Sequence, residues 1–252
     1  MTAAEDFAAI LPKLMEMYPA SWSMRLRDEH RQIGHVAHGW YMRVHRGIEA
    51  MLLLDEDGFG AEAAPLRRSI IEHVVGLQWL AKEGDVVRDA LISGAAHDAE
   101  RRKESLKAAG WTFVDWEAFD TVIADREGRD RSRNHELHFR QRCEKAGDQH
   151  DLAAWMTETA HSHPCWQSAA TYLDYDAETH GITLRGIGRS DVDATSFAVI
   201  HLFQALTALN AIVRGKPYNK RLASLGHAIK AAVVKHREAP GLAIPDVLLD
   251  RA

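Results

Sequence analysis

The segment from Glu62 to Glu83, EAAPLRRSIIEHVVGLQWLAKE, constrains the fold more than any other part of the chain. On a helical wheel of about 3.6 residues per turn, its apolar side chains cover nearly the whole circumference. They fall in two groups: Leu66, Ile70, Val74, Leu77 and Ala81 on one side, then Ile71, Val75 and Trp79 around the other. A helix that is apolar nearly all round lies at the centre of a protein. We therefore expect a helical bundle built around this segment.

Two charged residues interrupt the apolar surface of this helix. Arg68 and Glu72 stand four residues apart, so they share one face. A buried charge without a partner costs several kcal/mol, so the two side chains are expected to pair with each other or with groups from other helices. His73 falls in the most apolar sector. Two interpretations stay open: a structural ion pair beside a hydrogen-bonded core histidine, or polar groups that line a pocket.

Periodicity along the rest of the chain predicts a mainly α protein with one small sheet. Helical patterns cover residues 3–17, 26–54, 85–109, 114–125, 151–167, 193–214 and 220–236. Alternating residues flank a turn at 171–187, which is typical of a β-hairpin. The predicted fold is one domain over 1–252, a bundle of about six to eight helices with the hairpin inserted. Its core spans about 26–214, with a polar mobile connection at 125–150 and a tail at 237–252.

Composition excludes several classes of protein. The 252 residues are 46% hydrophobic, and 31 basic against 36 acidic side chains give a net charge of -5, which makes nucleic acid an unfavoured partner. Two cysteines are too few for a disulfide framework. The N-terminus is acidic, and no apolar run approaches the ~18 residues of a membrane span. These features predict a cytoplasmic protein with no membrane partner, and the Ala, Arg and Gly usage is typical of bacteria.

A row of polar side chains lies beside the apolar strip of the 26–54 helix. His38, His45 and Glu49 stand at spacings of seven and four residues. A metal site needs three or four converging ligands, and this helix supplies two or three at its border. The sequence therefore predicts no metal and no cofactor. These three residues remain candidates for a shared polar cluster.

The run from Thr159 to Trp166, TAHSHPCW, gathers more reactive side chains than any other stretch. It holds two imidazoles, three hydroxyl or thiol groups and an indole. Cys165 follows a proline in a local run with no orienting third group, so a structural cluster at a helix end is favoured over a nucleophile.

Two motifs together resemble a widespread bacterial family of uncharacterised all-helical proteins. They are LRRSIIE, from Leu66 to Glu72, and a later Thr159-x-x-x-His163-Pro-Cys165 run ahead of a hairpin and a final helix. The resemblance covers roughly 30–212, and Thr159 and Cys165 stand where the family pattern has serines. It implies that Arg68, Glu72 and His163 meet in space, in the bundle interior, with Thr159 beside them. A distant kinship with HEPN domains would be an analogy of fold only.

No motif is specific enough to name a reaction, so the function is open among three classes. The favoured class is a protein that binds a small polar ligand or a protein partner through the Arg/Glu/His cluster, with room for a homodimer. The first alternative is a HEPN-like ribonuclease, suggested by Arg133 and His138, but about four such Arg-to-His matches are expected by chance in this composition. The second alternative is a metal-dependent enzyme acting on a small molecule.

Overall fold

Three long helices form the centre of the molecule. The computed structural model describes residues 3–17, 25–147, 149–176 and 178–236. The central helices are α3 (Gly34–Glu56), α4 (Ala64–Glu83) and α10 (Ala194–Ile212). Each packs against the other two, and Ile48, Leu77 and Leu202, one from each helix, are fully buried. The mainly α bundle around the 62–83 and 193–214 segments is therefore confirmed.

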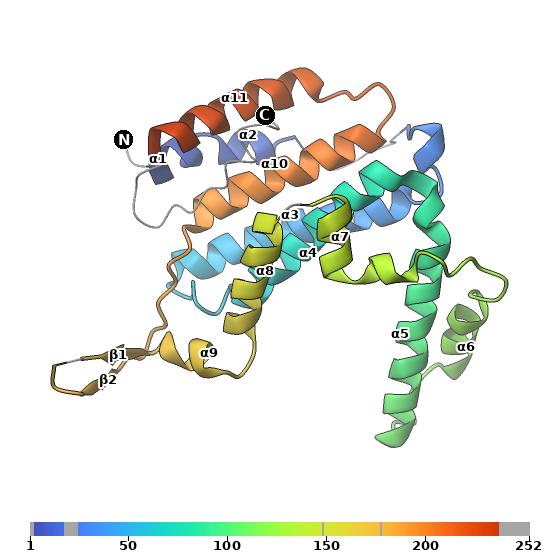
Figure 1. The fold of residues 1–252 in the computed structure, drawn as a ribbon, viewed down its shortest axis with the longest axis horizontal. Coiled ribbons are helices and arrows are strands. Elements are labelled where there is room, and N and C mark those ends of the chain that lie inside the picture. The colour runs from blue at the N-terminus through green and yellow to red at the C-terminus, as the bar shows by residue number, and fades with distance from the viewer. Residues whose placement is uncertain (1–2, 18–24, 148, 177, 237–252) are drawn as a thin grey trace.

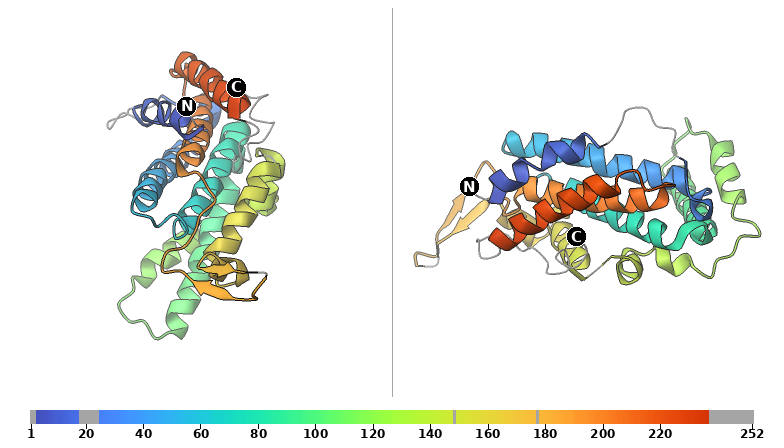
Figure 2. Two further views of the ribbon diagram at one scale, coloured as in Figure 1. Left: turned by 90° about the vertical axis from the view of Figure 1, so that its left-hand side faces the viewer. Right: turned by 90° about the horizontal axis from the view of Figure 1, so that it is seen from above.

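Short and long helices cover the two faces of this centre. On one side lie α1 (Ala3–Ala8), α2 (Leu11–Met15) and α11 (Asn219–His236), which pack on α10 and on one another (Figure 1). On the other side α7 (Phe139–Lys145) and α8 (Gln149–Ser162) pack against α4. The end-on view in Figure 2 shows α4 between α8 and the α3 and α10 pair. This position explains why so little of α4 is polar.

The helices α5 (Arg88–Ala108) and α6 (Trp116–Ala124) extend away from the bundle as a pair (Figure 1). The short 3-10 helix η2 (Gly84–Val87) turns the chain from α4 into α5. Gly84 has φ +67, and a Cβ there would lie 2.5 Å from the carbonyl oxygen of Glu29, so this turn needs glycine. Arg126 joins the two helices through two hydrogen bonds to Glu100, of 2.7 and 3.0 Å.

The predicted hairpin is confirmed. After α9 (Trp166–Ala170), strand β1 (Leu173–Tyr175) pairs antiparallel with β2 (Ile182–Leu184), with Asp174 opposite Thr183. The hairpin projects from the end of the bundle beside α9 (Figure 1). It falls within the 171–187 segment, although the strands are shorter than the alternating pattern. The predicted tail at 237–252 lies outside the described residues.

The chain ahead of α3 differs from the expected helix over 26–54. Leu26 forms an isolated antiparallel bridge with Val213, and residues 28–30 form the 3-10 helix η1 (Asp28–His30). The backbone N–H of Arg27 donates to the carbonyl of Ile212 at 3.0 Å, and that of Arg214 donates to Arg25 at 2.8 Å. These contacts with a segment far along the chain hold residues 25–27 extended, so the α-helix begins only at Gly34.

The segment 125–150 also differs from expectation, because two helical elements lie where a polar connection was predicted. They are the 3-10 helix η3 (Asn134–Leu137) and α7. Glu136 is buried between them and α4, where its carboxylate accepts hydrogen bonds from Trp79 Nε1 at 3.0 Å and from Arg133 at 2.7 Å. Arg133 also pairs with Glu83 at 2.5 Å. The balance of positive and negative charges in this segment suggested a solvated connection. Some of these charges instead form ion pairs within the fold, as Arg133 does with Glu83 and Glu136.

One helix is long and apolar enough to cross a membrane by length and composition. It is α10, and 67% of its apolar window is buried inside the bundle. Polar residues such as His201 and Asn210 interrupt the apolar run of this helix. A helix buried to this extent is typical of the core of a soluble protein.

The core contains a charged pair that the sequence did not predict. Arg67, next to Arg68, points inward, and its Nε donates to the Glu158 carboxylate of α8 at 2.8 Å. Both side chains are 5% exposed. A second guanidinium nitrogen donates to the carbonyl of Gly60 at 2.7 Å. The pair thus joins α8 to α4 and to the turn that precedes it.

We predict that Arg67→Met destabilises the fold by about 3–5 kcal/mol, because it leaves the Glu158 carboxylate buried without its partner. Arg68→Met is the matched control, since it removes the same group one position along the helix at a half-exposed site. It should cost about 1 kcal/mol or less. Urea unfolding of the two variants measures both values. Equal losses would contradict the assignment of Arg67 as the buried member.

We also predict an acid-dependent role for Glu136. Burial raises the pKa of this carboxyl, but the hydrogen bonds from Arg133 and Trp79 outweigh burial and leave the pKa below its usual value of 4.5. A carboxyl whose pKa is lower in the folded state stabilises the fold above the unfolded pKa and loses that effect as pH falls through the folded pKa. Glu136→Gln should therefore cost about 1–3 kcal/mol near neutral pH.

The difference between wild type and Glu136→Gln should shrink as the pH falls below 4.5, which urea unfolding over a pH series measures. Glu144→Gln serves as the control, because that carboxylate is 47% exposed and pairs only with Arg140. A constant difference across the acid range would show that the charge of Glu136 is not what stabilises this region.

Candidate functional site

Arg68, Glu72 and His163 meet on the surface between α4 and the end of α8. Arg68 Nε lies 3.2 Å from Glu72 Oε1, and its NH1 lies 2.6 Å from Nε2 of His163. Arg68 and His163 are 95 residues apart in the chain. The contact therefore joins the two motifs on which the family resemblance rests.

The cluster is not in the bundle interior, where the sequence placed it. The side chains of Arg68 and Glu72 are 28% and 36% exposed, and His163 is exposed. The interior charge on this turn of α4 is that of Arg67. Successive helix residues point about 100° apart, so adjacent arginines on one helix can have opposite environments. An exposed arrangement can meet a ligand, whereas the Arg67 pair cannot.

Trp155 of α8 completes the cluster. Its Nε1 donates to Glu72 Oε1 at 2.7 Å, and the Arg68 guanidinium lies over its ring at 5.2 Å from the centroid. The ring of Phe139 stacks on the other side at 4.8 Å. Trp155 and Thr159 stand four apart on one face of α8, and His163 follows at the same spacing just after the helix ends at Ser162. That spacing was the available signal for Trp155.

The contact between Arg68 and His163 defines the tautomer of the histidine. A guanidinium has only donors, so Nε2 of His163 must accept and carry no proton. In the neutral ring the proton then sits on Nδ1. Arg68 NH2 has no hydrogen-bond partner within the described residues. The cluster therefore presents unused donors at its exposed edge.

Positive charge exceeds negative charge around Glu72. Burial lowers the pKa of Arg142, and the charge of Glu72 opposes that shift. The guanidinium of Arg142 lies between the rings of Trp40 and Trp79, at 5.5 and 5.4 Å from their centroids. The charge of Glu72 thus acts on two arginines, by a direct bond to Arg68 and through space on Arg142. The local surplus favours an anionic ligand.

Within the described residues, the Thr159 side chain makes no bond to the side chains of Arg68, Glu72 or His163. Its hydroxyl donates to the backbone carbonyl of Trp155 at 2.7 Å, within its own helix. The thiol of Cys165 likewise donates to the carbonyl of Ala160 at 2.7 Å, and its sulfur accepts the N-cap hydrogen bond of α9. Both residues where serines were expected therefore serve helix geometry.

The α3 residues predicted as neighbours do not join the cluster. His45 and Glu49 pair with each other at 3.6 Å on α3, and Glu49 also contacts Arg46. Among the described residues, the side chains of Arg68, Glu72 and His163 make no hydrogen bond or ion pair with His38, His45 or Glu49. The long helix α3 packs on the side of α4 opposite α8 (Figure 2). The row of His38, His45 and Glu49 on α3 therefore does not reach the cluster of Arg68, Glu72 and His163. No group of three or more His, Cys, Asp or Glu side chains in the described segments could hold a metal ion.

An open pocket of about 560 Å³ lies beside the cluster, between α4, the end of α8 and α9. Pro65, one turn before Arg68, and Pro164, next to His163, form part of its wall. The other lining residues are Ala61, Glu62, His161, Cys165, Ser168, Ala169, Thr171 and Tyr172. The Tyr172 hydroxyl donates to Glu62, and this bond raises the pKa of the tyrosine. The pocket thus combines an apolar wall with one carboxylate.

The two Arg-to-His spacings that suggested a ribonuclease have other roles. Arg133 pairs with Glu83 and Glu136 at the edge of the core, while His138 is extended between η3 and α7. His73, five residues after Arg68, bonds through Nδ1 to the carbonyl of Ser69 at 2.6 Å, and burial lowers its pKa. Neither spacing presents an arginine and a histidine together on one exposed helical face.

We predict that His163 is found as the Nδ1–H tautomer when its ring is neutral, because Arg68 requires Nε2 as acceptor. Two-bond proton–nitrogen NMR spectra of the imidazole distinguish the two ring nitrogens. In Arg68→Met the constraint is absent, and the Nε2–H form should appear. A wild-type spectrum dominated by Nε2–H would show that the Arg68 contact does not form in solution.

Comparison with known proteins places this geometry in a family. No curated protein and no solved structure matches the chain. A family of unknown function, DUF5677, matches residues 34–180, which is more than half of the chain and contains Arg68, Glu72, Trp155, Thr159 and His163. Nothing in the comparisons supports kinship with HEPN domains. The chain therefore belongs to the DUF5677 family, and the uncharacterised family indicated by its two motifs is confirmed.

Proposed function

We propose that the protein binds a small polar ligand with an anionic group on the surface formed by α4, α8 and α9. The observation that carries the proposal is the contact of 2.6 Å between Arg68 and His163. Their near neighbours in the chain, Pro65 and Pro164, line an open pocket. The contact holds a guanidinium in place while leaving part of its donor capacity exposed. A charged donor that is oriented in advance binds an anion without the cost of ordering a flexible side chain.

Each part of the surface has a defined role in this proposal. Arg68 NH2 and the Nδ1–H of His163 donate to the anionic group, as charge-assisted bonds of this type are the strong ones. Trp155 and Glu72 keep the guanidinium oriented from behind. The apolar wall at Pro65, Pro164 and Ala169 accepts the body of the ligand, and Glu62 can accept a hydrogen bond from it. A pocket of about 560 Å³ suits a small molecule.

Neither alternative function has an observation in its favour. A metal-dependent reaction lacks converging ligands within the described residues. For the ribonuclease, the Arg133 and His138 spacing that suggested it has another use, because Arg133 bonds within the Glu136 network. Binding is therefore the function that we put forward, with no reaction assigned to it.

The proposal is tested with two probes, benzoate and phenyl phosphate, titrated into the full chain and followed by ligand-observed NMR. We predict dissociation constants of about 1 mM for the wild type, which is common for probes of this size. Arg68→Met should weaken binding about tenfold, because it removes a charge-assisted bond. Arg140→Met, at an arginine that is 77% exposed and pairs only with Glu144, should leave binding unchanged.

A second pair of variants tests the pocket independently of the charge. Ala169→Leu fills the lining of the pocket, whereas Ala170→Leu adds the same bulk to the same helix at an exposed position outside the lining. Only the first should reduce binding. Loss of binding in both, or in neither, would mean that the probes bind elsewhere.

A further inference from the structure

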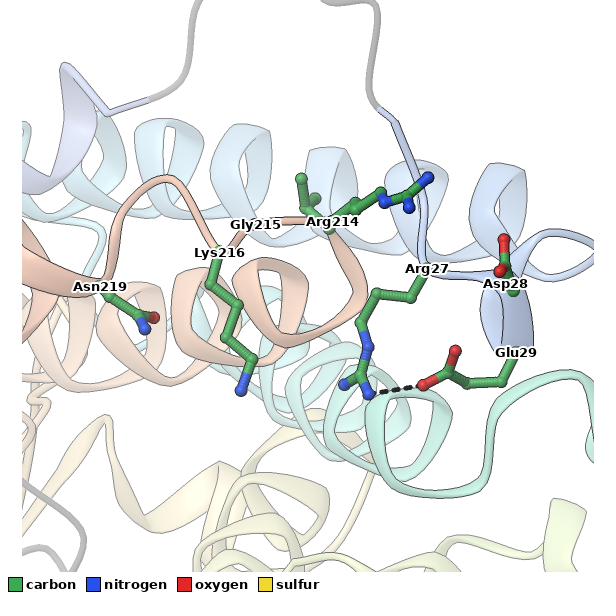
Figure 3. A pocket seen from close by; sticks show the side chains of 8 residues that line it. Arg27, Asp28, Glu29, Arg214, Gly215, Lys216 and Asn219 are labelled. Carbon is green, nitrogen blue, oxygen red and sulfur yellow. Dashed lines mark ion pairs between the residues drawn. The ribbon is translucent and has the colours of Figure 1, made fainter.

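A second pocket lies at the opposite end of α10, formed by two segments that are far apart in the chain. It is lined by Arg27, Asp28 and Glu29 ahead of α3, and by residues 213–216 and Asn219 between α10 and α11 (Figure 3). Its volume is about 480 Å³. The Leu26 to Val213 bridge and the backbone bonds beside it hold the two segments together. All lining residues fall outside the family match at 34–180, so this pocket is separate from the site of the proposed function.

Positive charge in this pocket is not balanced by the acidic residues beside it. Asp28 pairs with Arg31 at 2.6 Å, and Glu29 pairs with Arg27 at 2.6 Å. Both carboxylates therefore have a guanidinium partner of their own. Arg214 and Lys216 have no ion pair with any residue that the structure describes. Figure 3 shows that Arg214 points away from the pocket, so Lys216 is the cation that faces it without a carboxylate partner among the described residues.

Hydrogen-bond donors point into the same space. The buried amide of Asn210 donates from Nδ2 to Asn219 Oδ1 at 2.7 Å, and its own oxygen accepts from the backbone of Tyr218. The bond from Asn210 occupies the side-chain oxygen of Asn219, so the Nδ2 of Asn219 is left as a donor. Figure 3 shows the side chains of Arg27, Lys216 and Asn219 extending to the same side, while Arg214 points to the other. The three ends that face the pocket are all donors.

The backbone presents Lys216 in an unusual conformation. Its φ is +44, which is uncommon for a residue with a side chain. Gly215, with φ +77, precedes it, and α11 begins at Asn219. The N-terminal end of this 18-residue helix adds partial positive charge on the same side. Backbone strain of this kind costs free energy, and strained residues cluster at functional sites.

We infer that this pocket binds a phosphate group, as free phosphate or as the phosphate of a small monoester. Lys216 supplies a positive charge without a carboxylate partner among the described residues, and the acceptor oxygens of phosphate match the donors of Lys216 and Asn219. The Arg27 guanidinium lies beside them, although it also bonds to Glu29 and to the carbonyl of Ala211. The volume exceeds what phosphate alone needs, so the attached group of a monoester has room. The lining also differs from that of the α4 site, where a carboxylate and an apolar wall line the pocket.

The test is a titration of the full chain with inorganic phosphate and, separately, with adenosine monophosphate, followed by calorimetry. Lys216→Asn removes the charge and keeps a residue that tolerates positive φ, so the fold should stand. We expect phosphate binding to weaken about tenfold or more. Asn219→Asp keeps the acceptor for Asn210 and replaces the free donor with a negative charge, so binding should be lost.

Two control variants separate this site from other sources of binding. Lys220→Gln removes a nearby positive charge in the first turn of α11 outside the pocket, and it should change binding less than about twofold. Arg68→Met should leave phosphate binding here unchanged, and Lys216→Asn should leave benzoate binding at α4 unchanged, so either proposal can fail alone. Thermal unfolding of each variant verifies that it is folded.

Several results would overturn the inference. Absence of phosphate binding in the wild type at about 10 mM, the upper range for a weak specific site, would reject it. Equal weakening by Lys216→Asn and Lys220→Gln would show only a general charge effect. Tighter binding of adenosine monophosphate than of phosphate identifies the monoester as the source, whereas equal affinities identify free phosphate.

Discussion

The buried pair of Arg67 and Glu158 is the interaction on which the rest of this structure depends. It joins α4 to α8 in the interior and, through Gly60, also holds the turn ahead of α4. A pair of this kind is strongly orienting, because separating the two charges inside the protein is expensive. With α8 held in this way, Trp155 reaches Glu72 and His163 reaches Arg68 at the surface. The positions of the exposed cluster and of the pocket beside it thus depend on the buried pair of Arg67 and Glu158, which a ligand does not contact.

Polar side chains on α4 divide into those that stabilise and those that remain available. Arg67 and the indole of Trp79 are used entirely in buried bonds, to Glu158 and Glu136. Arg68 bonds to Glu72 and His163 and lies over the ring of Trp155, and its remaining guanidinium nitrogen has no partner among the described residues. The pocket at Lys216 follows the same rule, since its acidic neighbours already have partners. In both places the groups left over after internal pairing define the chemistry that the surface offers.

Periodicity was sufficient for most of the fold and insufficient where remote segments meet. The apolar patterns of 62–83 and 193–214 predicted the two central helices, because burial on all sides leaves a signal in local sequence. The prediction of a helix over residues 26–33 was wrong. The prediction of a mobile connection at 125–150 was wrong as well. The structure of these two segments depends on the bridge from Leu26 to Val213 and on the bonds that Glu136 receives from Trp79 and Arg133, and neither is visible in local spacing.

The sequence by itself determined that Arg68 and Glu72 share a face, since a spacing of four residues is sufficient, and its two motifs pointed to His163 as their neighbour. Only the tertiary structure decided how deep that cluster lies, that Arg67 rather than Arg68 is the interior charge, and that His38, His45 and Glu49 stay apart from it. The physical reason is that helical spacing gives the direction of a side chain about its own axis. What that direction faces is set by the packing of another helix, and here by α8.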